Sequence, residues 1–207
     1  KTMKFEILRN DSMNTVMGGT SGTDIPFPPM QLFDEEGNPN HSSNVAYSAN
    51  TGKTTNIKDV YTAKGFDFTG PKNFDKNTGY KTKSVMSVPL KNHENDIVGV
   101  MQLINATDKK SGKVVAFSDD MQQQVESLAS QGAVALTNKR LVAELKNLFE
   151  SFIKLIATAI DKKSPYTGGH CERVPEIAML LATAVENTKT GKYEEFSMTE
   201  DERYELF

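Results

Sequence analysis

The sequence predicts an α+β fold, an antiparallel sheet with helices, followed by one very long helix. Strand-like and helix-like segments come in the order strand, loops, short helix, long polar stretch, hairpin and long helix, which is typical of this class. Two apolar runs, at residues 85–90 and 97–106, flank a turn at 92–96 and predict the hairpin. Residues 118–163 contain no proline and a single glycine, Gly132, which favours one continuous helix.

The first elements are short. Residues 4–8 alternate, with apolar side chains at every second position, and predict a strand. Asn44 is expected to cap a short helix over residues 45–50, because asparagine is a preferred N-cap residue. Gly52 follows as the expected C-terminal stop of that helix.

The middle of the chain is predicted to be a long loop and a hairpin. Residues 56–82 are polar, with aromatic side chains at intervals, and we expect them to form a loop. The run over residues 97–106 is almost wholly apolar through Ile104. Strands of that kind are buried on both faces, so we expect this one to lie centrally in the sheet.

The long helix organises the prediction. Ser118 can cap its first turn, Asp119 and Asp120 suit the helix dipole, and Pro165 marks its far end. At ~1.5 Å per residue the helix would be roughly 70 Å long, too long for one small domain to cover. A 3,4 spacing of seam positions then begins at Asn138. These positions are Asn138, Leu141, Leu145, Leu148, Phe152, Leu155 and Ala159.

Two interpretations of this seam are open. The spacing is that of a coiled coil, which would make the chain a homodimer through the long helix, with Asn138 fixing the register. Alternatively, the long helix folds back on its own domain. Beyond it, a second amphipathic helix is expected to place Val174, Ile177 and Leu181 on one face. The predicted divisions are therefore residues 1–137, 138–163 and 164–207.

Composition narrows the classes of partner. Of 207 residues, 37% are hydrophobic and 25% are charged, which permits a globular core. The net charge of −3, with no long basic run, argues against nucleic acid or an anionic membrane as the main partner. The only cysteine, Cys171, fits a reducing compartment, and no apolar run approaches the ~20 residues of a membrane helix. We therefore expect a cytoplasmic protein.

Four motifs in the first 137 residues resemble a GAF domain, of the kind found in cyclic-nucleotide phosphodiesterases and bacterial signalling proteins. They are Asn56-Ile57-x-Asp59, Phe74-Asp75-x-x-Thr78-Gly79-Tyr80-x-Thr82, Ser87-x-Pro89-Leu90 and Ile97-x-Gly99-Val100-x-Gln102-Leu103-x-Asn105. The resemblance implies a small-molecule sensor with a profilin-like or PAS-like architecture. It also implies a helix and a strand upstream of Lys1, so we expect this chain to be a fragment.

The stretch 56–82 is the candidate ligand pocket, because GAF ligands sit under the corresponding loop. Phe74 can stack on a planar ring, while polar side chains nearby can bond its edges or a phosphate. The candidate ligand-binding residues are Asn56, Asp59, Phe74, Asp75, Thr78, Tyr80 and Thr82. The alternative is that Asp75, Thr78 and Gly79 build a turn and Tyr80 packs in the core. The ligand is unidentified, with nucleotide-like molecules among the candidates.

The cyclic-nucleotide ligands of related GAF domains are not expected here. Such domains carry Asn-Lys after the central strand, whereas Asn105 is followed by Ala106. They also carry Asp-Glu after Phe and three residues, whereas Phe117 is followed at that spacing by Met121 and Gln122. The ion pair of that motif therefore cannot form.

A second resemblance begins in the long helix. The stretch Ala159-Ile160-Asp161-x-Lys163-Ser164-Pro165-Tyr166-Thr167-x-Gly169-His170-x-x-Arg173-Val174 is similar to the opening of an HD-GYP domain. That family hydrolyses cyclic di-GMP at a centre of two or three divalent metals. The resemblance makes His170 a metal ligand in a complete domain. Tyr166, in place of a glutamate, favours a two-metal centre of Fe or Mn. The alternative for His170 is a histidine that caps a helix start.

These observations predict a regulatory GAF module in a bacterial signal-transduction protein, with an HD-GYP phosphodiesterase as its output. No His-Asp dipeptide occurs in the sequence, so these residues are not expected to be catalytic by themselves. The long helix would pass a ligand-induced change from the sensor to the output domain. The alternative from another class is a ligand-free GAF domain that acts only as a dimerisation scaffold.

Overall fold

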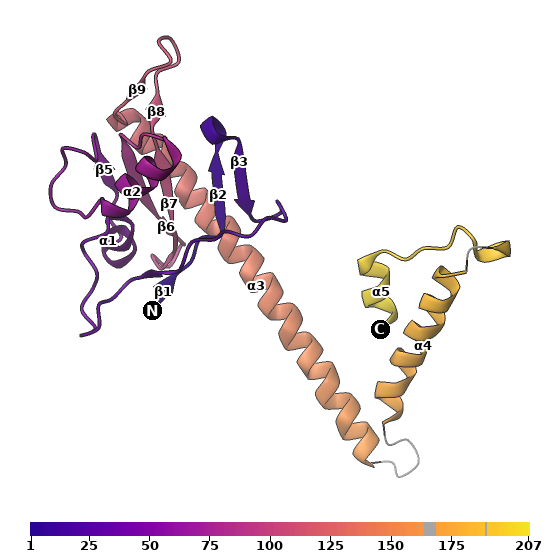
Figure 1. The fold of residues 1–207 in the computed structure, drawn as a ribbon. Helices are drawn as coiled ribbons and strands as arrows, with labels where there is room; N and C mark the ends of the chain where they lie inside the picture. The colour runs from indigo at the N-terminus through magenta and orange to yellow at the C-terminus, as the bar shows by residue number, and fades with distance from the viewer. Residues whose placement is uncertain (164–168, 189) are drawn as a thin grey trace. The chain divides into compact units, whose positions relative to one another are not determined.

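The computed structural model describes residues 1–163, 169–188 and 190–207. These residues form two compact units, Lys1–Arg140 and Leu141–Phe207, and each is described by itself (Figure 1). The described helices are α1 (Asn44–Thr51), α2 (Thr69–Thr78), α3 (Asp119–Lys163), α4 (His170–Glu186) and α5 (Glu200–Leu206). The division falls within α3, whose first part belongs to unit 1 and whose remainder belongs to unit 2.

Unit 1 contains the strands, which pair antiparallel. The main sheet has the order β5-β6-β7 and consists of β5 (Thr55–Ile57), β6 (Val85–Lys91) and β7 (Ile97–Ile104). Three two-stranded sheets join β1 (Thr2–Met3) to β4 (Met30–Gln31), β2 (Ile7–Asn10) to β3 (Thr15–Gly18), and β8 (Ala106–Thr107) to β9 (Val114–Val115). The α+β class predicted from the sequence is therefore confirmed.

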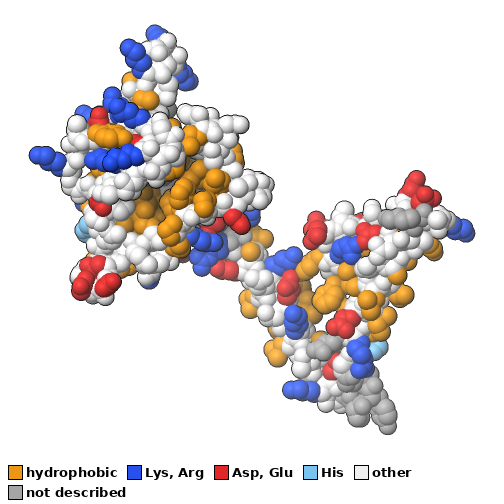
Figure 2. All heavy atoms as spheres, in the orientation of Figure 1, with side chains coloured by type: hydrophobic (Ala, Val, Ile, Leu, Met, Phe, Trp, Pro, Cys, Tyr) orange, Lys and Arg blue, Asp and Glu red, His pale blue; other side chains and the backbone are white. Residues whose placement is uncertain are grey.

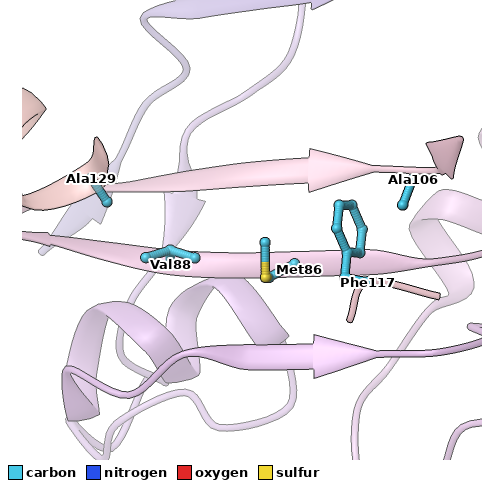
Figure 3. Close-up of a cluster of buried hydrophobic side chains, with 5 residues drawn as sticks. All are labelled: Met86, Val88, Ala106, Phe117 and Ala129. Carbon is cyan, nitrogen blue, oxygen red and sulfur yellow. The ribbon is translucent and has the colours of Figure 1, made fainter. Parts of the chain in front are cut away.

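The core of unit 1 lies where β6 meets the first part of α3. Met86 and Val88 of β6 pack in one buried cluster with Ala106, Phe117 and Ala129, which Figure 3 shows as sticks. Ala129 is 0% exposed, and its small side chain lets the backbone of α3 approach the sheet closely. This packing connects the central strand directly to the base of the long helix.

The other face of β6 is polar where α1 covers it. Asn44 Nδ2 donates to Ser87 Oγ at 2.9 Å, and Ser48 Oγ donates to the Ser87 carbonyl at 3.3 Å. The expected cap at Asn44 was wrong, because Ser43 accepts the N–H of Ala46 and Asn44 is the first residue of the helix. The expected stop at Gly52 is confirmed by its left-handed conformation, with φ of 65°.

Two strand predictions were wrong. No single strand spans residues 4–8, because β1 ends at Met3 to pair with β4, and β2 begins at Ile7 to pair with β3. In the described part of the chain β7 pairs only with β6, so β6 is the central strand and β7 lies at an edge. An apolar run alone did not reveal which of the two strands gains a second neighbour.

The stretch 56–82 is not the loop that we expected, because it contains α2 and most of β5. Asp67 precedes the helix, and its carboxylate accepts the N–H of Thr69 at 2.8 Å. Gly79 ends the helix in a left-handed conformation, with φ of 73°, and its N–H donates to the Asp75 carbonyl. Polar composition suggested a loop, whereas these two end signals define a short polar helix.

The long helix is confirmed from Asp119 to Lys163, and Ser118 Oγ accepts the N–H of Met121 as expected of a cap. Its predicted end at Pro165 and the substitution at Tyr166 lie outside the described residues.

In unit 2, α4 packs against α5, and Arg203 bonds Glu186. Lys146 Nζ lies 3.6 Å from the centre of the Tyr204 ring, so α5 also contacts α3. Thr199 and Glu202 form a reciprocal capping box at the start of α5.

Candidate functional site

The candidate site is centred on Asp75, in the last turn of α2. This carboxylate belongs to a residue that is only 6% exposed, and three donors converge on it. Its Oδ2 accepts the Tyr61 hydroxyl at 2.6 Å and the Thr82 N–H at 2.8 Å, while its Oδ1 accepts Thr82 Oγ1 at 2.8 Å. Asp75 therefore ties α2 to the segment before it and to the segment that leads into β6.

The end of α2 fixes the direction of the chain after Asp75. Thr78 Oγ1 donates to the Phe74 carbonyl at 2.8 Å and accepts the N–H of Tyr80 at 3.3 Å. Gly79 supplies the left-handed residue between them, which a side chain would strain. Thr78 is exposed, and its hydroxyl is used in the hydrogen bonds that end its own helix.

Asn105 holds the segment between α2 and β6 from the other side. Its Nδ2 donates to the Tyr80 hydroxyl at 2.9 Å and to the Lys81 carbonyl at 2.8 Å. Its Oδ1 accepts the N–H of Lys83 at 2.7 Å, and its own backbone is left-handed, with φ of 60°. Sequence reasoning used Asn105 only as part of a motif and missed this anchoring role.

Two adjoining hollows lie on this side of unit 1, with volumes of about 630 and 370 Å³. Tyr61 and Lys81 line both of them. The larger is lined in addition by Asp59 and Lys83, and the smaller by Lys72, Asp75, Lys76, Gly79 and Tyr80. Both hollows are open to solvent, and their volumes fall in the range of about 300–1,000 Å³ that small-molecule sites occupy.

Tyr61 lies among the charged side chains of the site. Its hydrogen bond to Asp75 is the main reason that its pKa lies above the ordinary value of 10.0, followed by burial and by the charges of Asp75 and Asp59. Two ammonium groups lie near its ring, Lys72 Nζ at 5.6 Å and Lys81 Nζ at 5.8 Å from the centroid. The neutral phenol thus sits between a carboxylate that it bonds and two cations.

The residues predicted from sequence divide into two groups. Asp59, Asp75 and Tyr80 line the hollows, and Thr82 is buried beside Asp75. Phe74 and Asn56 are directed elsewhere. The ring of Phe74 meets the edge of Phe27 at 6.4 Å, and Asn56 Nδ2 donates to the Phe117 carbonyl and to Gln122 Oε1 at the start of α3.

Sequence reasoning missed the lysines and Tyr61, which carry most of the lining. A sequence signal for them exists, because Lys72 and Lys76 are one helical turn apart and Lys81 and Lys83 alternate in an extended segment. That signal becomes visible only once α2 is recognised as a helix.

The seam positions of α3 are exposed, and all of them except Asn138 belong to unit 2. Leu145, Leu148 and Leu155 are 66%, 68% and 66% exposed, and Asn138, Leu141 and Phe152 are exposed as well. A second exposed stripe runs beside the seam and consists of Val142, Phe149, Ile153, Ile156 and Ile160. At 3.6 residues per turn the two stripes together cover an arc of about 160°. Figure 2 shows apolar side chains on the surface of this stretch.

His170 is exposed and begins α4, after Gly169 in a left-handed conformation. Residues 1–163, 169–188 and 190–207 contain no group of three histidine, cysteine, aspartate or glutamate side chains placed to hold a metal ion. A two-metal centre thus does not fit these residues by themselves. Nor is any helix within the same ranges long and apolar enough to span a membrane.

Comparison with known proteins identifies the first unit. The GAF domain family matches residues 18–136. The "Dual 3',5'-cyclic-AMP and -GMP phosphodiesterase 11A" of Takifugu rubripes is 31% identical over 117 residues, which are 56% of this chain and 12% of that protein. The "cGMP-specific 3',5'-cyclic phosphodiesterase" of Drosophila melanogaster is 40% identical over 60 residues, 29% of this chain and 5% of that protein.

Solved structures show looser likeness. The GAF domain of an Acinetobacter phosphoenolpyruvate-protein phosphotransferase is 14% identical, covers 64% of this chain and 70% of that chain, and has a TM-score of 0.37. The curated relatives are much longer than this chain, which spans 12% or less of the two phosphodiesterases named above. Because the family match covers more than half of the sequence, the chain belongs to the GAF domain family.

Proposed function

We propose that unit 1 is the ligand-sensing regulatory module of a cytoplasmic signal-transduction protein. The observation that carries the proposal is the Asp75 network. Tyr61, which donates to Asp75, lines both hollows, while Thr82, which also donates to Asp75, leads directly into β6. A ligand that contacts Tyr61 is therefore two hydrogen bonds away from Thr82, which lies three residues before the central strand begins at Val85.

The path continues from β6 into the long helix. Met86 and Val88 follow Thr82 along the chain and pack against Ala129 of α3. Asn56 adds a second link, because it bonds Gln122 in the first turn of α3. A ligand shifts this path only if it binds two states of the sensor unequally.

The ligand contacts remain those predicted from the sequence, with a change of emphasis. Asp59, Asp75 and Tyr80 line the hollows and are the proposed direct contacts. Thr78 and Thr82 position these contacts through their hydrogen bonds to the Phe74 carbonyl and to Asp75. Asn56 and Phe74 lie beside the site and bond or pack against other segments. Cyclic AMP and cyclic GMP are disfavoured, because buried Ala106 stands where related domains carry the lysine of their ion pair.

Output through a homodimer is the second half of the proposal. The exposed seam of Leu141, Leu145, Leu148, Phe152 and Leu155 is what a second copy would cover. The segment that resembles an HD-GYP opening supports a bacterial cyclic di-GMP phosphodiesterase as the output domain. There His170 would be one ligand of an Fe or Mn pair that supplies an activated hydroxide.

A second candidate function is a ligand-free dimerisation scaffold. One observation favours it: the carboxylate of Asp75 is already occupied by donors from Tyr61 and Thr82, and the Thr78 hydroxyl is used by its own helix. On this alternative the network is purely structural.

Native mass spectrometry of the purified chain, first gently desolvated and then denatured, separates the two functions. The sensor predicts a bound small molecule that is released on denaturation and is lost from a Tyr61→Ala variant. Tyr193→Ala, an exposed tyrosine of unit 2, is the matched control and should retain the molecule. A chain that carries no small molecule after expression in several hosts would favour the scaffold.

A further inference from the structure

We propose that the hollow around Tyr61 binds a nucleoside polyphosphate, with its phosphates on Lys72, Lys76, Lys81 and Lys83. This inference rests on the proposed sensor function and names the chemical class of its ligand. The lysines come from two elements. Lys72 and Lys76 lie on α2, and Lys81 and Lys83 lie on the segment that enters β6.

The hollows carry an excess of positive charge. The chain carries a net charge of −3, yet four lysines gather at these two hollows against the carboxylates of Asp59 and Asp75. Figure 2 shows the basic side chains over this part of unit 1. Asp59 and Asp75 can balance two of the four ammonium charges, so an excess of two positive charges remains at the hollows.

Among the described residues, the four ammonium groups are not used in ion pairs with nearby carboxylates. Within residues 1–163, 169–188 and 190–207, the ion pairs closer than 4 Å involve other side chains. Lys72 lies near enough to Asp67 to contribute to lowering the pKa of that carboxyl, after the hydrogen bonds from Thr69. Like charges gathered within a Debye length of about 8 Å repel one another, and a multivalent anion removes that cost.

The aromatic ring of Tyr61 lies near the ammonium groups of Lys72 and Lys81. Tyr61 is 43% exposed, and its hydroxyl is held by Asp75, so the orientation of the ring is fixed before any ligand arrives. Lysine ammonium groups bind phosphate as point charges, and a shift of Lys72 and Lys81 from the Tyr61 ring to the phosphates would free the ring to stack on a planar base. Together these groups suit phosphates and a base in one molecule, which inorganic phosphate alone would not exploit.

The test is isothermal titration calorimetry of the full chain with ATP, GTP, inorganic triphosphate and adenosine, at 50 and 200 mM salt. We expect ATP or GTP to bind more tightly than triphosphate, and adenosine to bind most weakly. Binding should weaken at the higher salt, because the phosphate contacts are electrostatic. Equal affinity for triphosphate and both nucleotides would overturn the stacking role of Tyr61, and binding by none of them would overturn the site.

Charge reversal locates the site. Lys72→Glu combined with Lys81→Glu should weaken nucleotide binding at least tenfold. Lys109→Glu combined with Lys110→Glu, two exposed lysines of the β8–β9 turn, is the matched control and should leave affinity unchanged. Circular dichroism of both double variants checks that each is folded. An equal loss in both pairs would show nonspecific charge attraction and overturn the proposal.

Failure of this inference differs from failure of the sensor function. If native mass spectrometry finds a small molecule that stays on the Lys72→Glu, Lys81→Glu variant, the sensor stands and the polyphosphate site is wrong. If single-stranded RNA binds the hollow more tightly than ATP or GTP and depends on the same lysines, the ligand class is wrong.

Discussion

The two parts of α3 use apolar side chains in opposite ways. In unit 1, Ala129 and Ala133 are 0% exposed, and Ala129 packs in one cluster with Met86 and Val88 of the sheet. In unit 2, Leu145 and Leu148 are 66% and 68% exposed. One continuous helix therefore presents small residues where it is covered and large residues where it is not.

The contrast fits the two purposes proposed for the helix. Alanine at the sheet allows a close approach, so a small displacement of β6 would be felt at the base of the helix. Large apolar residues at alternating three- and four-residue spacing are costly in water, and exposed stripes of that kind mark an interaction surface. We propose that the first part receives a signal and that the second part pairs with a second copy.

The largest expected effect comes from breaking the pairing part. Leu145→Glu combined with Phe152→Glu should convert a dimer into a monomer, because two carboxylates would be buried at the seam of each helix. Light scattering after size-exclusion chromatography measures the mass. Asn147→Glu with Lys154→Glu, on the polar side at the same spacing, is the control and should remain dimeric. A dimer that survives the seam substitutions would exclude the seam.

The receiving part should be most sensitive at Asp75. Asp75→Ala removes three hydrogen bonds to a buried carboxylate and should lower the free energy of unfolding of unit 1 by about 3 kcal/mol. Urea unfolding followed by tyrosine fluorescence measures the change. Asp96→Ala should cost less than about 0.5 kcal/mol, as is usual for an exposed position. Similar losses in the two variants would contradict the central role of the network.

A smaller effect is expected at Tyr61, and it should depend on pH. Tyr61→Phe removes one hydrogen bond and should lower the free energy of unfolding at neutral pH by less than Asp75→Ala does. Because the folded protein raises the pKa of Tyr61, this stabilisation is fully present below 10.0 and is lost as pH rises through the folded value. Unfolding of both proteins between pH 7 and 11 should show the difference shrinking above pH 10.0. A difference in the free energy of unfolding that stays constant over this pH range would show that deprotonation of the Tyr61 hydroxyl does not affect its bond to Asp75.

The smallest effect is a gain, in the first part of α3. Gly132 lies inside this helix, has ordinary helical geometry, and has open space where a Cβ would point. Gly132→Ala should therefore raise the free energy of unfolding by about 0.5–1 kcal/mol. A loss of stability on thermal or urea unfolding would indicate that this position needs the conformational freedom of glycine.

Much of the fold was predictable because its signals are local. The hairpin of β6 and β7, the stop at Gly52 and the start of α3 at Ser118 follow from neighbouring residues. The position of β7 at an edge was not predictable, because it depends on which strand finds a second partner. The short helix α2 was not predicted because most of its residues are polar. Its one aromatic side chain, Phe74, contacts Phe27, which lies far away in the sequence.

The candidate site was predictable only in part. Asp75 and Thr82 are hydrogen-bonded to each other, with Tyr61 as a further partner that no motif contained, and Tyr80 lines the same hollow as Asp75. The anchoring role of Asn105 depends on a left-handed backbone that composition does not reveal. The second apolar stripe of α3 was overlooked because the seam alone satisfied the coiled-coil pattern.

We propose that one chain combines a ligand-binding sensor and a pairing helix. Native mass spectrometry tests both features at once, since each chain has a mass of 22.9 kDa. We expect a dimer that carries a nucleotide-sized molecule, and loss of that molecule from the Lys72→Glu, Lys81→Glu variant without loss of the dimer. A monomer with no bound molecule would contradict both parts of the proposal.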